Sequence, residues 1–419
     1  MRCSPCAVCA VALAVALAAC GGRASRPTLP VAPAPAVPAS DLATARDGAI
    51  RVDASDGGLA AKDPRVIDLD IIRVQVTPAA PGKEPEATAV ASAELFRQAT
   101  DAAKDGRHRE AMATYRQLVT EFRESQYAPL SLFNIAAIHD KQGDVPGTIA
   151  ALRELIAAYP GSRESIEGHL YIAALQSEKA QWPDALATLD EILARTSLTL
   201  ADRVEAHARR GYALLELGRH ADADAALAAA TADWRRAPRI EDPYYIAMAH
   251  YYRGELAHRR FAASPVRLPD DQLAKDLEAR RVLAAQAYDR WKESLSHRHA
   301  YWATASGYQM SQIFVELWEV TVKAPYPMQL DPAARARYVG EIHARVRVHL
   351  EKALEGHKMN VELAKAYGVD NEWSRASAVR AVEVMELLAK DARGEYVTPA
   401  SPAGEGRGTP DPSKPQFLR

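Results

Sequence analysis

The chain repeats itself, and this self-similarity constrains its fold more than any other feature. A short turn recurs at Gly106, Gly143, Ala180 and Gly218, in steps of 37, 37 and 38 residues. Apolar residues at helical spacing precede and follow each turn. A unit of two helices joined by a turn leaves an apolar flank that only the next unit can cover, so such units stack. The sequence therefore predicts an all-α solenoid of helix hairpins.

The repeated region has a regular part and a divergent part. We expect four regular repeats over residues 91–235 and divergent helical hairpins over residues 236–392. In the divergent part, Pro332 suits the first turn of a long helix that runs to about Tyr367. A closing helix is predicted from Ser374 to about Lys390.

The small and helix-ending residues of these units resemble the tetratricopeptide repeat pattern. They are Gly211, Ala111, Ala185, Ala223 and Pro160. The period of 37 residues exceeds the 34 residues of the standard repeat. In this respect the chain is similar to periplasmic repeat lipoproteins of outer-membrane assembly and of Tol-Pal coordination. The resemblance implies a tetratricopeptide-type solenoid whose partners are other proteins of the envelope.

The resemblance also implies a partner-binding groove on the inner face of the first helices. Aromatic side chains there would act as rigid anchors for a partner segment. The alternative is that they fill the hairpin cores, which we favour for most of the aromatic residues. The family's concave positions correspond here to Phe133, Ala137, Asp140, Leu170, Ala174, Ala208 and Tyr212.

A narrower resemblance covers the divergent part. Trp302-Ala303, the loop Pro325-Tyr326-Pro327 and Asn371-Glu372-Trp373 look like the C-terminal half of large repeat lipoproteins of myxobacteria. Some of those lipoproteins belong to the gliding-motility machinery. The shared motifs are structural, so they indicate lineage and location more than a task.

Residues 1–19 have the features of a secretory signal peptide. A short positive start precedes an apolar run that is too short to span a membrane. The run ends in Leu17-Ala18-Ala19-Cys20, which resembles the lipobox of bacterial lipoproteins and implies lipidation of Cys20. The residue that follows is Gly21, which favours the outer membrane and its periplasmic face. Three of the four cysteines lie in residues 1–19 and the fourth is Cys20, so the mature chain is expected to form no internal disulfide.

Two further segments have the composition of chains that do not fold alone. Residues 20–90 are rich in Pro and Ala, and we expect a lipidated flexible linker there. Within it, residues 66–76 alternate in the manner of a strand. This strand would either dock on the helical body or pair with the sheet edge of a partner. Residues 393–419 are expected to be disordered.

The sequence shows no pattern typical of catalysis or of a cofactor site. None of the 12 histidines lies in an HExxH arrangement, and nucleophile elbows and phosphate-binding loops are missing. Lys and Arg number 52 against 54 Asp and Glu, so no strong field attracts nucleic acid. We expect no enzymatic activity, metal, cofactor, nucleic acid or small-molecule substrate.

These features together predict a non-enzymatic periplasmic scaffold. It would be held at the outer membrane by lipid on Cys20 and would bind envelope proteins through the solenoid groove, within a trans-envelope complex such as the gliding machinery. The alternatives are a component of outer-membrane protein assembly, an accessory factor in peptidoglycan remodelling, or a carbohydrate-binding module.

Overall fold

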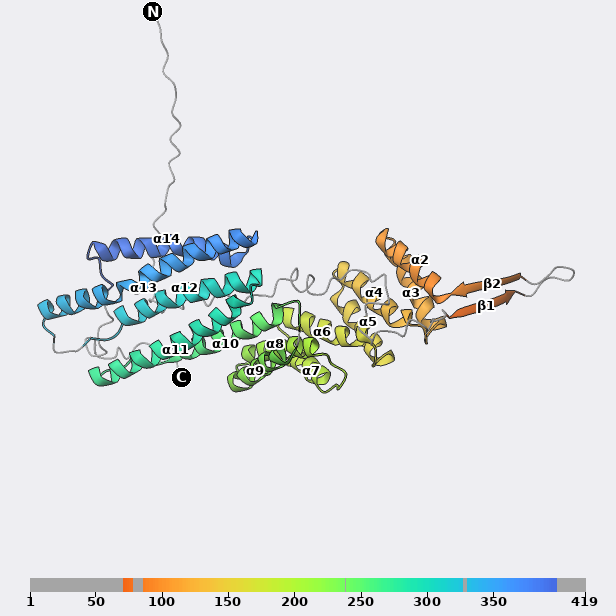
Figure 1. Cartoon of the computed structure of the whole chain (residues 1–419), viewed down its shortest axis with the longest axis horizontal. Helices are drawn as coiled ribbons and strands as arrows, with labels where there is room; N and C mark the ends of the chain where they lie inside the picture. The colour runs from red at the N-terminus through yellow and green to blue at the C-terminus, as the bar shows by residue number, and fades with distance from the viewer. Residues whose placement is uncertain (1–70, 78–85, 238, 327–329, 398–419) are drawn as a thin grey trace, which may run out of the picture.

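The computed structural model describes residues 71–77, 86–237, 239–326 and 330–397. Over these residues the chain is an elongated stack of helices with a two-stranded sheet at its N-terminal end (Figure 1). No helix in these ranges is long and apolar enough to cross a membrane. The predicted signal peptide, Cys20 and linker residues 20–70 lie outside the described residues.

Four helix hairpins form the regular part of the stack. In each hairpin the first helix packs on the second, the second packs on the first helix of the next hairpin, and successive first helices contact one another. This pattern confirms the all-α solenoid that the repeat period predicts. The hairpins are α2 (Ser92–Lys104) with α3 (His108–Glu121), α4 (Tyr127–Lys141) with α5 (Val145–Ala158), α6 (Arg163–Glu178) with α7 (Trp182–Leu193), and α8 (Leu200–Glu216) with α9 (His220–Arg236).

The turns within these hairpins share one backbone conformation. Gly106, Gly143 and Gly218 have φ values of +77°, +72° and +72°, which glycine adopts without steric penalty. Ala180 stands at the equivalent position of the third hairpin with φ +53°. An L-residue in this left-handed region is strained, so the third turn carries a cost that the other three avoid.

Small residues let the paired helices approach closely. A Cβ atom on Gly211 of α8 would lie 2.4 Å from Cγ of Leu227 on α9. The same device recurs in the next hairpin, formed by α10 (Tyr244–Ala263) and α11 (Asp270–Ser296). There a Cβ on Gly254 would lie 2.4 Å from Nε1 of Trp291. The divergent part therefore continues the packing of the regular part.

Three longer helices close the stack: α12 (Ala300–Val322), α13 (Pro332–Tyr367) and α14 (Glu372–Ala392). The Asp331 side chain accepts a hydrogen bond from the Ala334 N–H at 2.7 Å and caps the start of α13. Gly368, with φ +68°, ends it. Because α14 packs on both α12 and α13, it lies where the first helix of a further hairpin would lie.

The sheet corrects our reading of the segment before the helices. Strand β1 (Ile72–Thr77) pairs antiparallel with β2 (Glu86–Ala91), with Ile72 opposite Ala91. The predicted strand therefore finds its partner within the chain. Residues 86–90, which we assigned to the linker, form β2 and lead directly into α2. Pairing satisfies backbone groups that a lone strand would leave open.

The first residues of the predicted C-terminal tail are ordered in the structure, whereas we expected the tail from residue 393 to be disordered. The Tyr396 ring lies 4.5 Å from the His343 ring of α13, and His343 Nε2 donates to the Val397 carbonyl oxygen at 3.1 Å. Tyr396 and Val397 thus pack on the helical body, because an aromatic ring and a backbone acceptor meet the buried His343 there. The rest of the predicted tail, 398–419, lies outside the described residues.

The strained turn gives a test of the repeat geometry. Replacing Ala180 with Gly should raise the free energy of unfolding by about 0.5–1 kcal/mol, since relief of left-handed strain exceeds the added chain entropy. Gly143→Ala is the matched control, because its Cβ would meet nothing within 4 Å. It should lower stability by about 1 kcal/mol. Urea unfolding followed by circular dichroism measures both, and equal effects would contradict the assignment of Ala180 to this turn.

Candidate functional site

The predicted groove residues lie on the inner helices of the stack, as their repeat positions require. Their side chains, however, are largely inaccessible in the structure. Exposure lies between 0% and 6% for Phe133, Ala137, Leu170, Ala174, Ala208 and Tyr212, and only Asp140 is partly exposed. The six buried residues do not form an open wall in this structure, and their contact with a partner stays a prediction.

Aromatic residues of the first helices fill the core, as we favoured for most of them. The rings of Tyr212 and Tyr252 stack with their centroids 4.4 Å apart, and Trp302 packs against Tyr251 and Tyr252. Burial raises the pKa of Tyr212 to about 12, and it raises the pKa of Tyr252 well above its ordinary value. These side chains are therefore neutral packing elements that join α8, α10 and α12.

A row of charged side chains runs across the same helices. Arg163 of α6 donates to Asp202 of α8 at 2.6 Å, which links two successive repeats. Arg209 of α8 donates to Glu205 at 2.9 Å and to the Tyr245 hydroxyl of α10 at 2.6 Å. The row thus steps from α6 through α8 to α10, with each arginine held by partners from two elements.

The electrostatics of this row keep its side chains charged, although Asp202, Glu205 and Arg209 are buried. Burial alone would raise the pKa of Asp202, but the hydrogen bond and the charge of Arg163, together with hydrogen bonds from Thr199, leave the pKa lowered. Burial alone would lower the pKa of Arg209, yet Tyr245 and Glu205 leave it raised. Buried charges that are paired and hydrogen-bonded set the register of neighbours rather than add much stability.

Our sequence analysis missed this row, although the sequence contains a signal for its two glutamates. Glu167 accepts a hydrogen bond from Arg163, as Glu205 does from Arg209. Glu167 and Glu205 each stand 13 residues before their turn residues, Ala180 and Gly218. A carboxylate at the same repeat position in two units would have indicated a shared role. The pairing of Arg163 with Asp202 was not readable, because it depends on how α6 and α8 lie against each other.

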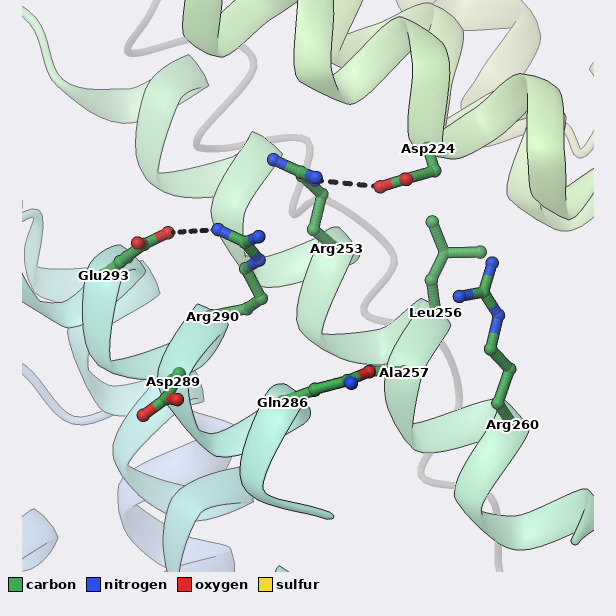
Figure 2. A pocket seen from close by; sticks show the side chains of 9 residues that line it. All are labelled: Asp224, Arg253, Leu256, Ala257, Arg260, Gln286, Asp289, Arg290 and Glu293. Atoms are coloured by element: carbon green, nitrogen blue, oxygen red, sulfur yellow. Dashed lines mark hydrogen bonds and ion pairs between the residues drawn. The ribbon is translucent and has the colours of Figure 1, made fainter. Parts of the chain in front are cut away.

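A polar cavity of about 390 Å³ opens between α9, α10 and α11 (Figure 2). Leu256 and Ala257 form its apolar part. Arg253 donates to Asp224 at 2.9 Å, and Arg290 donates to Glu293 at 2.9 Å. The remaining lining residues are Arg260, Gln286 and Asp289.

One histidine beside the cavity is held neutral by its surroundings. His250 Nδ1 lies 2.8 Å from a Glu293 carboxylate oxygen, and its ring stacks on His297. Burial lowers the pKa of His250 to about 4. Burial alone would raise the pKa of Glu293, but Arg290 and His250 leave it lowered, so Glu293 is ionised at neutral pH.

The side chains that line this cavity are suited to binding a charged group of a partner. Within the described ranges, no group of three or more His, Cys, Asp or Glu residues is arranged to hold a metal ion. The cavity carries three arginines and three carboxylates, and two of the arginines are already paired inside it. Arg260 is exposed and pairs with no carboxylate among the residues that the structure describes. It is the group best placed to meet a partner's acidic side chain.

Comparison with known proteins agrees with this architecture. Residues 83–240 match the family model described as a tetratricopeptide repeat-like domain, which spans β2 and the four regular hairpins. The fold is a tetratricopeptide-type helix-hairpin solenoid. Proteins of this type are typically interaction scaffolds without catalysis, and partner proteins are the ligands that the fold suggests.

Solved tetratricopeptide structures are also similar, at low sequence identity. One is a tetratricopeptide repeat protein from Parabacteroides merdae, with 13% identity and a TM-score of 0.32. Another is the C-terminal part of a repeat-containing protein from Cytophaga hutchinsonii, with 12% identity and a TM-score of 0.37. Each match covers 71% of this chain and 98% of the other. No curated protein matches the chain.

The buried His250 predicts a pH-dependent stability. Its pKa is about 4 in the folded protein and about 6.5 when unfolded, so only the unfolded state takes up a proton between these values. Stability should therefore fall as the pH is lowered from about 6.5 to about 4. His250→Gln should flatten this part of the curve, measured by urea unfolding at a series of pH values. His220→Gln, in the first turn of α9, serves as the control. An unchanged slope in His250→Gln would contradict the neutral histidine.

Proposed function

We propose that this protein is a lipid-anchored scaffold of the bacterial cell envelope that assembles protein partners on its helical repeats. The observation that carries the proposal is the solenoid itself, because stacked hairpins present long surfaces suited to partner proteins. The cavity between α9, α10 and α11, which is lined mainly by charged side chains, supports recognition rather than chemistry.

The anchor gives the scaffold its place. The lipobox-like Leu17-Ala18-Ala19-Cys20 supports lipidation at Cys20, and Gly21 supports the periplasmic face of the outer membrane. From Cys20 to the first described residue, Ile71, the chain has the Pro- and Ala-rich composition of a tether. A tether of this length has a root-mean-square span of roughly 40 Å. The helical body would thus sample partners near the membrane at a raised local concentration.

Two surfaces of the body are the proposed contact points. Asp140 at the end of α4 is the one predicted groove residue that is partly exposed. Arg260 on α10 lies at the cavity and is exposed as well. An acidic group on α4 and a basic group on α10 would let the scaffold hold two partners, as a trans-envelope complex such as the gliding machinery requires.

The anchor is tested by one substitution. Cys20→Ser should abolish lipidation, measured by mass spectrometry of the purified protein, and should move the protein from the membrane to the soluble fraction. Its circular dichroism should stay unchanged, because Cys20 is remote in sequence from the first helix. Cys9→Ser, in the segment removed by processing, is the control and should leave fractionation unchanged. Membrane retention of Cys20→Ser would overturn the anchor.

The contact surfaces are tested by charge reversal in the lipid-anchored protein. Phe133 and Tyr212 are unsuitable sites because their burial means that substitution also perturbs the core. Asp140→Arg changes a partly exposed charge and Arg260→Glu an exposed one. Each should reduce recovery of its cross-linked partner about tenfold, the equivalent of one lost charge-assisted contact. Asp222→Arg, on the exposed first turn of α9, is the matched control. Full recovery with both variants would contradict these surfaces.

A further inference from the structure

The chain turns back onto the helical body directly after α14. Gly394, with φ +73°, ends the helix, and its N–H donates to the Asp391 carbonyl oxygen at 3.1 Å. Helix α13 packs along α14 (Figure 1), so this turn brings Tyr396 and Val397 against α13. A local helix-ending motif therefore delivers the start of the tail to a defined place on the body.

The tail meets a buried histidine at this place. His343 of α13 is 2% exposed, and each of its two ring nitrogens faces an acceptor. Nδ1 lies 2.6 Å from Oδ1 of the buried Asp391 on α14, and Nε2 lies 3.1 Å from the Val397 carbonyl oxygen. The Tyr396 ring packs on the imidazole with the centroids 4.5 Å apart, and the Trp318 ring of α12 meets it edge-on at 5.8 Å. The histidine thus joins the tail to all three helices that close the stack.

The number of protons on this pair follows from its hydrogen bonds. A neutral imidazole carries one N–H, and its other nitrogen can only accept. The Val397 carbonyl oxygen and an ionised Asp391 are both acceptors, so the two contacts form together only when the His343–Asp391 pair holds two protons. This is true whichever atom, Nδ1 or Oδ1, carries the proton between them. The docked tail therefore needs one proton more than a neutral histidine supplies.

The charges around the ring determine which contact fails when that proton leaves. Asp391 also lies 3.5 Å from Arg347 of α13, which keeps a second cation beside the carboxylate. Helix α12 meets the ring with the uncharged Trp318, and the tail meets it with the ring of Tyr396. The short contact to a carboxylate is the stronger of the two, so a neutral histidine keeps its hydrogen on Nδ1. The Nε2 lone pair then faces the Val397 carbonyl oxygen with no hydrogen between them, which disfavours docking.

We propose that His343 is a proton-dependent clasp that fastens the start of the C-terminal tail to the end of the helical body. With the second proton in place the clasp is closed, and Val397 packs on the apolar cluster that includes Trp318 and Val346. Without that proton the clasp opens, uncovers this cluster and releases the chain that follows Gly394. The clasp is independent of the lipid anchor and of the partner contacts proposed above, and it makes this end of the scaffold sensitive to pH.

The direction and the limit of the effect follow from proton linkage. Because the docked tail binds one proton more than the released tail, lowering the pH favours docking. One linked proton changes the ratio of docked to released tail by at most about tenfold per pH unit. The range to examine is about pH 5.5 to 8, in which histidine side chains gain or lose a proton.

The first test follows the tail by electron paramagnetic resonance in the full chain. The four cysteines are replaced by serine so that lipid and disulfides play no part, and Glu395→Cys places a nitroxide label on an exposed residue beside Tyr396. The label should be immobilised at about pH 5.5 and increasingly mobile toward about pH 8. His343→Gln should remove this pH dependence, because glutamine gains no proton. His349→Gln should keep it and is the matched control, since this histidine of the same helix stacks its ring on Phe314 of α12.

A second variant separates the clasp from simple packing. Asp391→Asn keeps the size of the side chain, but its amide nitrogen can donate to Nδ1 of His343 while its oxygen still accepts from Arg347. One ring proton, on Nε2, is then enough for both contacts of the histidine. The tail of Asp391→Asn should therefore stay immobilised over the whole pH range, whereas a merely structural ion pair, once broken, would release the tail at every pH.

Two outcomes would overturn the proposal. One is a label whose mobility in the parent chain does not change over the pH range, and the other is a pH dependence that His343→Gln leaves intact. Circular dichroism at each pH confirms the fold. If His343→Gln does not fold, Asp391→Asn decides, and a tail that it releases also overturns the clasp. None of these outcomes bears on the lipid anchor or on the contacts of Asp140 and Arg260, so this inference can fail while the proposed scaffold function stands.

Discussion

Every part of this structure depends on one constraint: a single helix hairpin leaves an apolar flank exposed, and only a neighbouring hairpin can cover it. The contact between α8 and α9 covers one flank of each helix, and the other flank of α9 is covered by α10. Stability in such an array comes from nearest neighbours, so each interface matters to the units on either side of it. The close approach at Gly211 and Gly254 makes these interfaces tight, since a Cβ at either position would collide with the facing helix.

Polar contacts are laid over this apolar framework and fix the register between units. The pairing of Arg163 with Asp202 holds α6 against α8, and that of Arg209 with Tyr245 holds α8 against α10. Apolar stacking alone tolerates sliding, whereas a buried charge that loses its partner is strongly unfavourable. The row therefore favours one register of α6, α8 and α10 against one another.

The same constraint explains where interaction surfaces arise. Inner positions such as Ala208 and Tyr212 are covered in this structure, so the side chains that a partner could reach are the exposed charged ones. At the N-terminal end the β1–β2 hairpin leads into α2, and at the other end α14 exposes Val379, Val382 and Met385 among charged side chains.

The sequence by itself determined the helical hairpins, their period and their turns, because these follow from local rules. Glycine at Gly106, Gly143 and Gly218 permits a left-handed turn, and apolar spacing on either side specifies helices. The same local rules indicated the start of α13 at Pro332. Only the tertiary structure decided which residues meet across helices. The pairing of β1 with β2, the charged row, the cavity and the docking of Tyr396 on His343 all join distant segments. Helical spacing alone could not distinguish a side chain that lines a groove from one that fills a core, since both recur with the same period, and this distinction depends on what lies against the helix.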